Sequence, residues 1–189
     1  MAATEVLRAV ESVAFERDQQ EFALGDTLDI KTGLILASLT FLAILSGDLM
    51  KSSGISHVEC WAMLADEQPM ITGAFLQWLA QLVSVLAIIV GGTYSVLVLY
   101  PRDYDREPPP SKYVSWIADM EKYRADYPNA NVQPVTADDL TAARIDNAIA
   151  NVKKNGDNNK RKSSLMFVAF LCTVISFGAN VFTLAIRLF

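Results

Sequence analysis

Three uncharged and mostly apolar stretches alternate with polar segments along the chain. They run from Thr32 to Gly47, from Gln68 to Pro101 and from Ser163 to Ile186. A bilayer core is about 30 Å thick and needs roughly 20 apolar helical residues to cross it. Backbone groups in lipid must hydrogen-bond internally, so each stretch is expected to be an α-helix. The first is short, and flanking lysines that snorkel to the interface would complete it. We therefore predict transmembrane helices over residues 32–50, 71–100 and 163–187.

The segments outside these stretches carry apolar residues at helical spacing. Residues 4–28 are expected to form an amphipathic helix, within an N-terminal segment of residues 1–31. After the second span, Pro108 to Pro110 favour an extended polyproline conformation, and helices are expected over 111–126 and 136–155. The polar run from Asn155 to Asn159 indicates a helix end or a hinge. The helix over 136–155 should have an apolar face of Ala142, Ile145, Ile149 and Val152 and a polar face of Arg144, Asn147, Asn151 and Lys154.

The fold class predicted from this pattern is an all-α membrane protein with three transmembrane helices and a cytoplasmic helical region. The net charge is −5, but lysine and arginine are unevenly placed: eleven of the sixteen lie between residues 102 and 162, and three lie before the first span. The positive-inside rule then places the N-terminus and residues 101–162 in the cytoplasm. Residues 51–70 become an extracytoplasmic loop.

The sequence offers little for catalysis. It has no phosphate-binding glycine loop, nucleophile elbow or metalloprotease motif, and no span carries a charge well inside it. His57, Glu59 and Cys60 do not complete a metal site. Cys60 and Cys172 should lie at different depths, so no disulfide is expected between them. We predict a protein that is not an enzyme and that has no metal, no cofactor and no nucleic-acid partner.

Small and polar residues recur within the second and third spans at steps of three and four, which places them on one helix face. One interpretation is helix packing, since small and amide side chains let helices approach and hydrogen-bond. The other is that these faces line a water-filled path when several copies assemble. The residues are Gln77, Gln81, Ser84, Gly91 and Ser95 in the second span, and Thr173, Ser176, Asn180 and Thr183 in the third.

The region between the second and third spans combines basic and aromatic residues that could hold an anionic ligand. An arginine can bind a phosphate with two hydrogen bonds, and an aromatic ring can stack on a base. The alternative is that the aromatic side chains pack the helices of this region. The candidates are Arg102, Arg106, Tyr113, Trp116, Arg124 and Arg144, while the cluster Lys160–Lys162 is most simply a signal for anionic lipid and topology.

Three parts of the chain together resemble a known family. Leu28 to Gly33 leads directly into the first span, Tyr100-Pro101-Arg102 ends the second, and the proline-rich strip is followed by Tyr113 to Ala118. A helix rich in lysine and asparagine then leads into the last span. This architecture resembles the transmembrane effectors of Pycsar antiphage systems, and more loosely other small helical effectors found beside synthases of nucleotide second messengers.

The resemblance implies a multi-pass protein of the bacterial inner membrane that senses cyclic CMP or cyclic UMP, a cyclic pyrimidine nucleotide made by a companion cyclase during phage infection. It implies abortive infection through an oligomeric pore or disruption of the bilayer. The helix over 136–155 would be the lever, because ligand binding must favour one packing of the spans. The alternative from another class is a constitutive membrane scaffold or accessory subunit without a small ligand.

Overall fold

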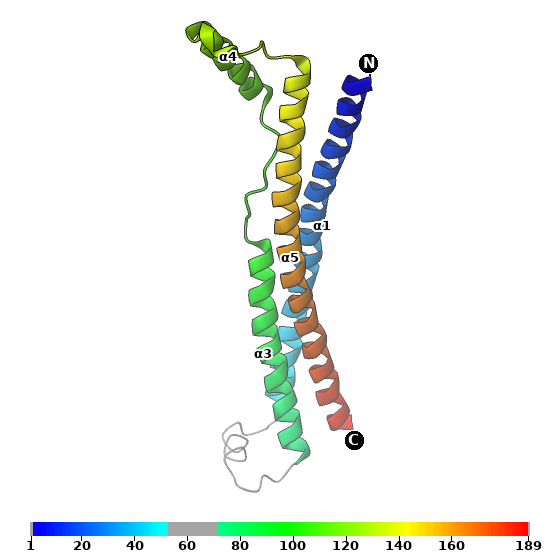
Figure 1. Ribbon diagram of the computed structural model, residues 1–189. Helices are drawn as coiled ribbons and strands as arrows, with labels where there is room; N and C mark the ends of the chain where they lie inside the picture. The colour runs from blue at the N-terminus through cyan, green and yellow to red at the C-terminus, as the bar shows by residue number, and fades with distance from the viewer. Residues whose placement is uncertain (1, 53–71, 189) are drawn as a thin grey trace, which may run out of the picture. The chain divides into compact units, whose positions relative to one another are not determined.

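The structure is a computed structural model that describes residues 2–52 and 72–188. Over these residues the chain is helical and contains no strand (Figure 1). The α-helices are α1 (Ala2–Ser52), α3 (Gly73–Leu99), α4 (Pro110–Asp126) and α5 (Ala137–Leu188), and a short 3-10 helix, η1, covers Pro128–Ala130. Three helices are long and apolar enough to cross a membrane. The predicted fold class, an all-α membrane protein with three such helices, is confirmed.

The predicted break at Asn155 to Asn159 is wrong, because α5 is continuous, and α1 is continuous as well. The helix expected over 4–28 and the first span form one helix, and α5 runs through Asn155 to Asn159 without an end or a hinge. Neither helix contains a proline in its interior. A glycine in a helix costs only about 1 kcal/mol relative to alanine, an amount that packing can offset. Asn155 and Asn159 are buried and hydrogen-bonded, so tertiary contacts outweigh their preference for turns.

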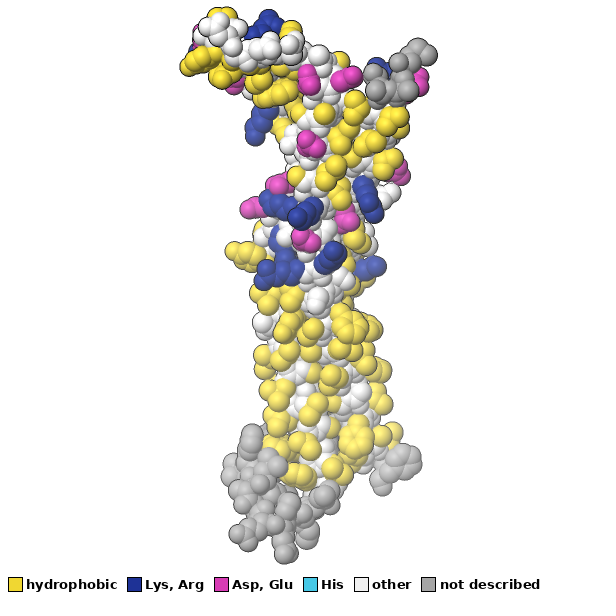
Figure 2. All heavy atoms as spheres, in the orientation of Figure 1, with side chains coloured by type: hydrophobic (Ala, Val, Ile, Leu, Met, Phe, Trp, Pro, Cys, Tyr) yellow, Lys and Arg dark blue, Asp and Glu magenta, His cyan; other side chains and the backbone are white. Residues whose placement is uncertain are grey.

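The chain divides into two compact units. The membrane unit comprises Thr27–Pro101 and Arg161–Phe189, and the extramembrane unit comprises Met1–Asp26 and Arg102–Lys160. The visible face of the membrane unit is almost wholly hydrophobic (Figure 2). Such a surface suits lipid, whereas most of the charged residues belong to the extramembrane unit.

Close helix packing in the membrane unit centres on Gly91 of α3. A Cβ atom at this position would lie 2.8 Å from Cys172 Cβ on α5 and 3.1 Å from Leu39 Cδ1 on α1. A Cβ at the next residue, Gly92, would meet nothing within 4 Å. The absence of a side chain at Gly91 therefore lets three helices approach, as small residues do in membrane helix packing.

Two helix starts in the extramembrane unit follow from their sequence. Pro109 is extended, with φ −61° and ψ 150°, and Pro110 occupies the first turn of α4, where its missing N–H removes no hydrogen bond. Ser111, which was expected to cap this helix, lies in its first turn instead, and the N-cap is Pro109. At α5, Asp139 N donates to Thr136 Oγ1 at 3.2 Å, and Thr136 N donates to Asp139 Oδ2 at 2.9 Å. This reciprocal pair is a capping box with aspartate.

The predictions for residues 51–70 concern a segment that lies mostly outside the described residues. They include the extracytoplasmic loop and the judgement that His57, Glu59 and Cys60 do not form a metal site. Cys172 is buried and not disulfide-bonded.

Candidate functional site

The membrane unit contains a buried layer of polar side chains contributed by all three of its helices. Ser84 of α3 is its centre, with Oγ 2.9 Å from Ser46 Oγ on α1 and 2.8 Å from Ser176 Oγ on α5. Asn180 joins both helices, since its Nδ2 donates to Ser84 Oγ at 3.1 Å and its Oδ1 accepts from Ser46 Oγ at 3.0 Å. Each of the four side chains is at most 1% exposed. We call these four residues the polar layer.

The other residues predicted on the polar faces of α3 and α5 lie in the same interior. Gln81, Ser95 and Thr183 are buried, and each has a side-chain donor without a partner among the described residues. Buried polar groups are usually satisfied, so these positions carry unused hydrogen-bonding capacity. Thr173 is half-buried and donates to Ala169 O at 3.0 Å on its own helix.

Gln77 lies at the other end of the predicted face, beside Arg187. With its amide oxygen turned toward the guanidinium, Gln77 accepts from Arg187 Nε at 2.6 Å and from Nη2 at 2.9 Å. Arg187 Nη1 also donates to Ser52 Oγ at 2.8 Å. These contacts hold the ends of α1, α3 and α5 together in the membrane unit.

The aromatic and basic candidates of the extramembrane unit are only partly brought together. Tyr113 and Arg144 line a hollow of about 570 Å³ between α4, α5 and the proline strip. Trp116 and Arg102 are half-buried but do not line the hollow. The remaining candidates lie elsewhere: Arg106 stacks 4.8 Å from the centre of the Phe22 ring, and Arg124 pairs with Glu121 at 2.9 Å.

Arg144 is already held by two carboxylates and a ring. Its Nη1 lies 2.6 Å from Glu11 Oε1, and its Nε lies 2.9 Å from Glu107 Oε1. The guanidinium carbon is 4.8 Å from the centre of the Phe15 ring. Burial opposes its charge, but the hydrogen bond and charge of Glu107 and the charge of Glu11 raise the pKa of Arg144 overall. An incoming anion would therefore compete with Glu11 and Glu107 for this cation.

A row of asparagines on α5 forms a second polar contact inside the extramembrane unit. Asn155 Nδ2 donates to Asp18 Oδ1 at 3.2 Å on α1 and to Asp105 O at 3.0 Å on the extended segment. One turn later, Asn159 Nδ2 donates to Glu21 O at 2.7 Å, and its Oδ1 accepts from Tyr104 Oη at 2.7 Å. These amides tie α1, α5 and the segment after the second span together.

The position of Asp18 in this row disfavours the charged form of its carboxyl group. Burial raises the pKa of Asp18, the side chains of Asn155 and Asn151 lower it, and the charge of Glu107 raises it further, with a net rise above the usual value. The carboxylate is therefore less stable in the folded chain than in water.

Comparison with known families accounts for most of the chain. Residues 16–189 match PycTM, the Pycsar effector protein domain. The chain belongs to this family. Comparison with curated proteins and comparison with solved structures each gave no match. Membership confirms the family resemblance, and together with the three apolar helices it supports a role as a membrane effector of antiphage defence.

Several residues of this Pycsar effector that make specific contacts were not among the predicted site residues. Ser46 completes the polar layer from α1 and was not predicted as a site residue. Asn151, predicted on a polar face, is 7% exposed, whereas Ile149, predicted on the apolar face, is 55% exposed. Ile145 of the predicted apolar face is buried as expected. The face of α5 that packs in the extramembrane unit thus combines Ile145 and Ala148 with the buried asparagines, which periodicity alone assigns to solvent.

Lys162 was predicted to serve as part of a signal for anionic lipid and topology. In the membrane unit, Lys162 Nζ lies 2.7 Å from Asp29 Oδ1, and the lysine side chain is 4% exposed. Lys162 is therefore buried in an ion pair with Asp29, whereas Lys160 and Arg161 are exposed.

Proposed function

We propose that this Pycsar effector is an oligomeric membrane protein gated by a cyclic pyrimidine nucleotide, cyclic CMP or cyclic UMP, supplied by a companion cyclase. In this proposal the bound state impairs the inner membrane and arrests or kills the infected cell. The observation that carries it is the family match over residues 16–189, joined to polar faces in all three apolar helices. The distribution of lysine and arginine supports a cytoplasmic N-terminus and a cytoplasmic extramembrane unit.

The hollow beside the proline strip is the proposed ligand site. Its volume of about 570 Å³ falls in the range of small-molecule sites. Tyr113 offers an aromatic ring for the pyrimidine, and Arg144 offers a guanidinium for the cyclic phosphate. Because Glu11 of α1 and Glu107 now hold Arg144, a phosphate that takes this cation would free α1 from α5 at this point.

Gating requires that the ligand bind one packing of the spans better than another. Helix α5 is suited to this role because Arg144 and the polar-layer residues Ser176 and Asn180 belong to one continuous helix. In the described conformation the polar layer faces the interior of a single chain. The open state would turn these side chains, with Gln81 and Thr183, toward a path shared by several copies. The unused donors of Gln81 and Thr183 would then face water.

A membrane-potential dye in cells tests this proposal. The chain is expressed with an active or an inactive pyrimidine cyclase, and protein levels in the membrane are matched. Depolarisation is expected only with the active cyclase, and Arg144→Gln should abolish it. Arg124→Gln, which removes a surface arginine paired within α4, is the matched control and should depolarise normally. A well-expressed chain that never depolarises with either nucleotide would favour the constitutive scaffold.

A further inference from the structure

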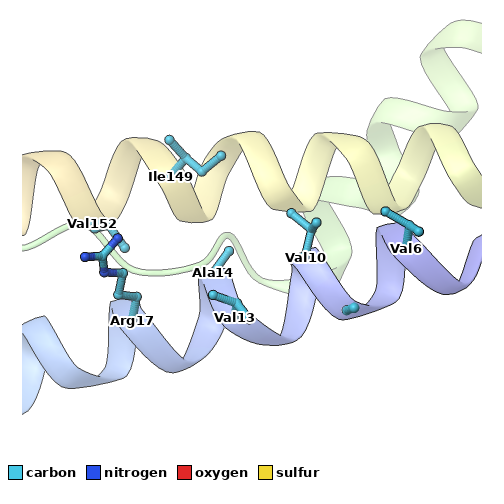
Figure 3. Close-up of a pocket in the computed structure, with 8 residues that line it drawn as sticks. Val6, Val10, Val13, Ala14, Arg17, Ile149 and Val152 are labelled. Carbon is cyan, nitrogen blue, oxygen red and sulfur yellow. The ribbon is translucent and has the colours of Figure 1, made fainter.

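An apolar groove runs between α1 and α5 in the extramembrane unit (Figure 3). It has a volume of about 500 Å³ and is lined by Val6, Val10, Val13, Ala14, Ile149 and Val152, with Arg17 at one end. Val6 is 61% exposed, Val13 is 62% exposed and Ile149 is 55% exposed. A contiguous apolar surface on a water-facing unit usually marks an interaction site. We call this surface the valine groove.

The spacing of the valines favours a helical occupant. Val6, Val10 and Val13 follow steps of four and three, and the same steps continue through the polar residues Arg17 and Gln20 to the exposed Leu24. A repeat of seven residues with apolar side chains at alternating steps of three and four is the pattern by which parallel helices pack. This stripe differs from the face of α1 that contacts α5 within the chain, since that face carries residues such as Asp18 and Glu21.

The direction of the two helices favours a second copy of this chain as the occupant. Asn155 contacts Asp18 and Asn159 contacts Glu21, so residue numbers rise together along α5 and α1 and the two helices are parallel. Copies inserted in one membrane share the same orientation. A twofold axis along the helices would therefore bring two valine grooves face to face and create a bundle of four parallel helices. Such a contact is self-complementary, because each copy supplies the same surface.

Charges beside the groove are complementary across this axis. Asp18 lies level with Asn155, so Glu16 on α1 lies at the height of Lys153 on α5. Both side chains are exposed, and Lys153 forms no ion pair with any described residue. When two grooves meet, α1 of one copy lies beside α5 of the other. Glu16 then faces Lys153 of the second copy, and the same pair recurs on the other side of the axis.

We propose that the valine groove is the interface through which two copies of this chain associate outside the membrane, with α1 and α5 of each copy forming a four-helix contact. The inference rests on the proposed function only in taking the working state to be an assembly. It adds a specific surface, a symmetry and an ion pair to that assembly.

Crosslinking in native membranes tests the interface. Val13→Cys is made in a Cys60→Ser background, and membranes without nucleotide are treated with a short bis-maleimide. A covalent dimer is expected. Ser12→Cys is the matched control, because Ser12 is exposed and adjacent in sequence but points about 100° away around the helix. It should give little dimer. Equal crosslinking at both positions, or none at Val13→Cys, would overturn the proposal.

A charge reversal distinguishes a specific contact from nonspecific association of apolar surfaces. Glu16→Lys should lower the dimer yield of Val13→Cys several-fold, and adding Lys153→Glu should restore it. If the double variant stays low while its membrane level is normal, the twofold arrangement is wrong. If a cyclic nucleotide, and not a second copy, protects Val13→Cys from maleimide, the groove is a ligand site and the proposed interface is refuted. A chain that crosslinks normally but never depolarises membranes would contradict gating alone.

Discussion

Lys162 of α5 and Asp29 of α1 form a two-pronged ion pair, with Lys162 Nζ 2.7 Å from Oδ1 and 2.8 Å from Oδ2. The lysine side chain is almost wholly buried, while the aspartate side chain is 41% exposed. Burying an ammonium group is costly unless a carboxylate compensates it. Asp29 therefore fixes the position of α5 against α1 in the membrane unit.

Removing the carboxylate should destabilise the membrane unit. We expect Asp29→Asn to lower the free energy of unfolding by about 1–2 kcal/mol, less than for a fully buried pair because water screens the exposed part of Asp29. Thermal unfolding in detergent would measure the change. Asp26→Asn, which removes an exposed carboxylate in the same helix, is the control and should leave the midpoint unchanged. Equal midpoints for both variants would show that the ion pair does not stabilise the fold.

The close approach at Gly91 gives a matched pair of glycine variants. Gly91→Ala places a Cβ 2.8 Å from Cys172 Cβ, so the helices must move apart, at a cost of about 1–3 kcal/mol. Gly92→Ala adds the same methyl group where nothing lies within 4 Å, and alanine favours the helix. We expect a clear fall in thermal stability for the first variant and no fall for the second. The reverse order would contradict the packing of α3 against α1 and α5.

The helical fold could be predicted because length, hydropathy and capping are local properties. The three apolar stretches and the Thr136–Asp139 cap predicted elements that the structure contains. The continuity of α1 and α5 could not be predicted in the same way. From sequence alone, Asn155 and Asn159 are typical of a helix end. Their partners on α1 lie more than 100 residues away in sequence, and those on the extended segment lie about 50 residues away.

In the candidate site, too, features set by local spacing could be predicted, and contacts between residues distant in sequence could not. Residue spacing placed Ser84 on the polar face of the second span and Asn180 on the polar face of the third. Both residues lie in the polar layer. Nothing in the sequence pairs Ser46 with them, because a hydrogen bond across 134 positions depends on how the helices meet. Likewise, a basic residue such as Arg144 can be named as a ligand candidate, but its two carboxylate partners appear only in the fold.

Replacing Asn180 with leucine should show whether the polar layer lines a water-filled path or only packs the helices. The variant leaves Ser46 and Ser84 short of a partner, and interhelical hydrogen bonds of this kind contribute about 0.6–2 kcal/mol. Thr93→Leu is the control, since Thr93 is exposed and bonds only within α3. If the layer lines a path, Asn180→Leu should remain in the membrane but lose cyclase-dependent toxicity. If the layer only packs helices, the amount of Asn180→Leu in the membrane should fall first, before any separate loss of toxicity.

The raised pKa of Asp18 predicts a pH dependence for the extramembrane unit. The folded chain binds a proton at Asp18 more readily than the unfolded chain, whose carboxyl has the ordinary value of 3.8. Stability should therefore fall as pH rises from 3.8 through the folded pKa and then level off. Asp18→Asn keeps an acceptor for Asn155 and removes this dependence. Urea midpoints in detergent between about pH 4 and pH 7 would measure it, and an unchanged pH profile in Asp18→Asn would refute this origin.

Ion flux through liposomes that contain only the purified chain tests the central proposal most directly. Vesicles are loaded with a fluorescent ion reporter, and cyclic CMP, cyclic UMP or cyclic AMP is added outside. Because the chain inserts in both orientations, part of the population exposes its extramembrane unit to the added nucleotide. We predict rapid flux with one cyclic pyrimidine nucleotide, none with cyclic AMP, and none with Arg144→Gln. Flux that is the same with and without nucleotide, or absent throughout despite folded protein in the bilayer, would contradict nucleotide gating.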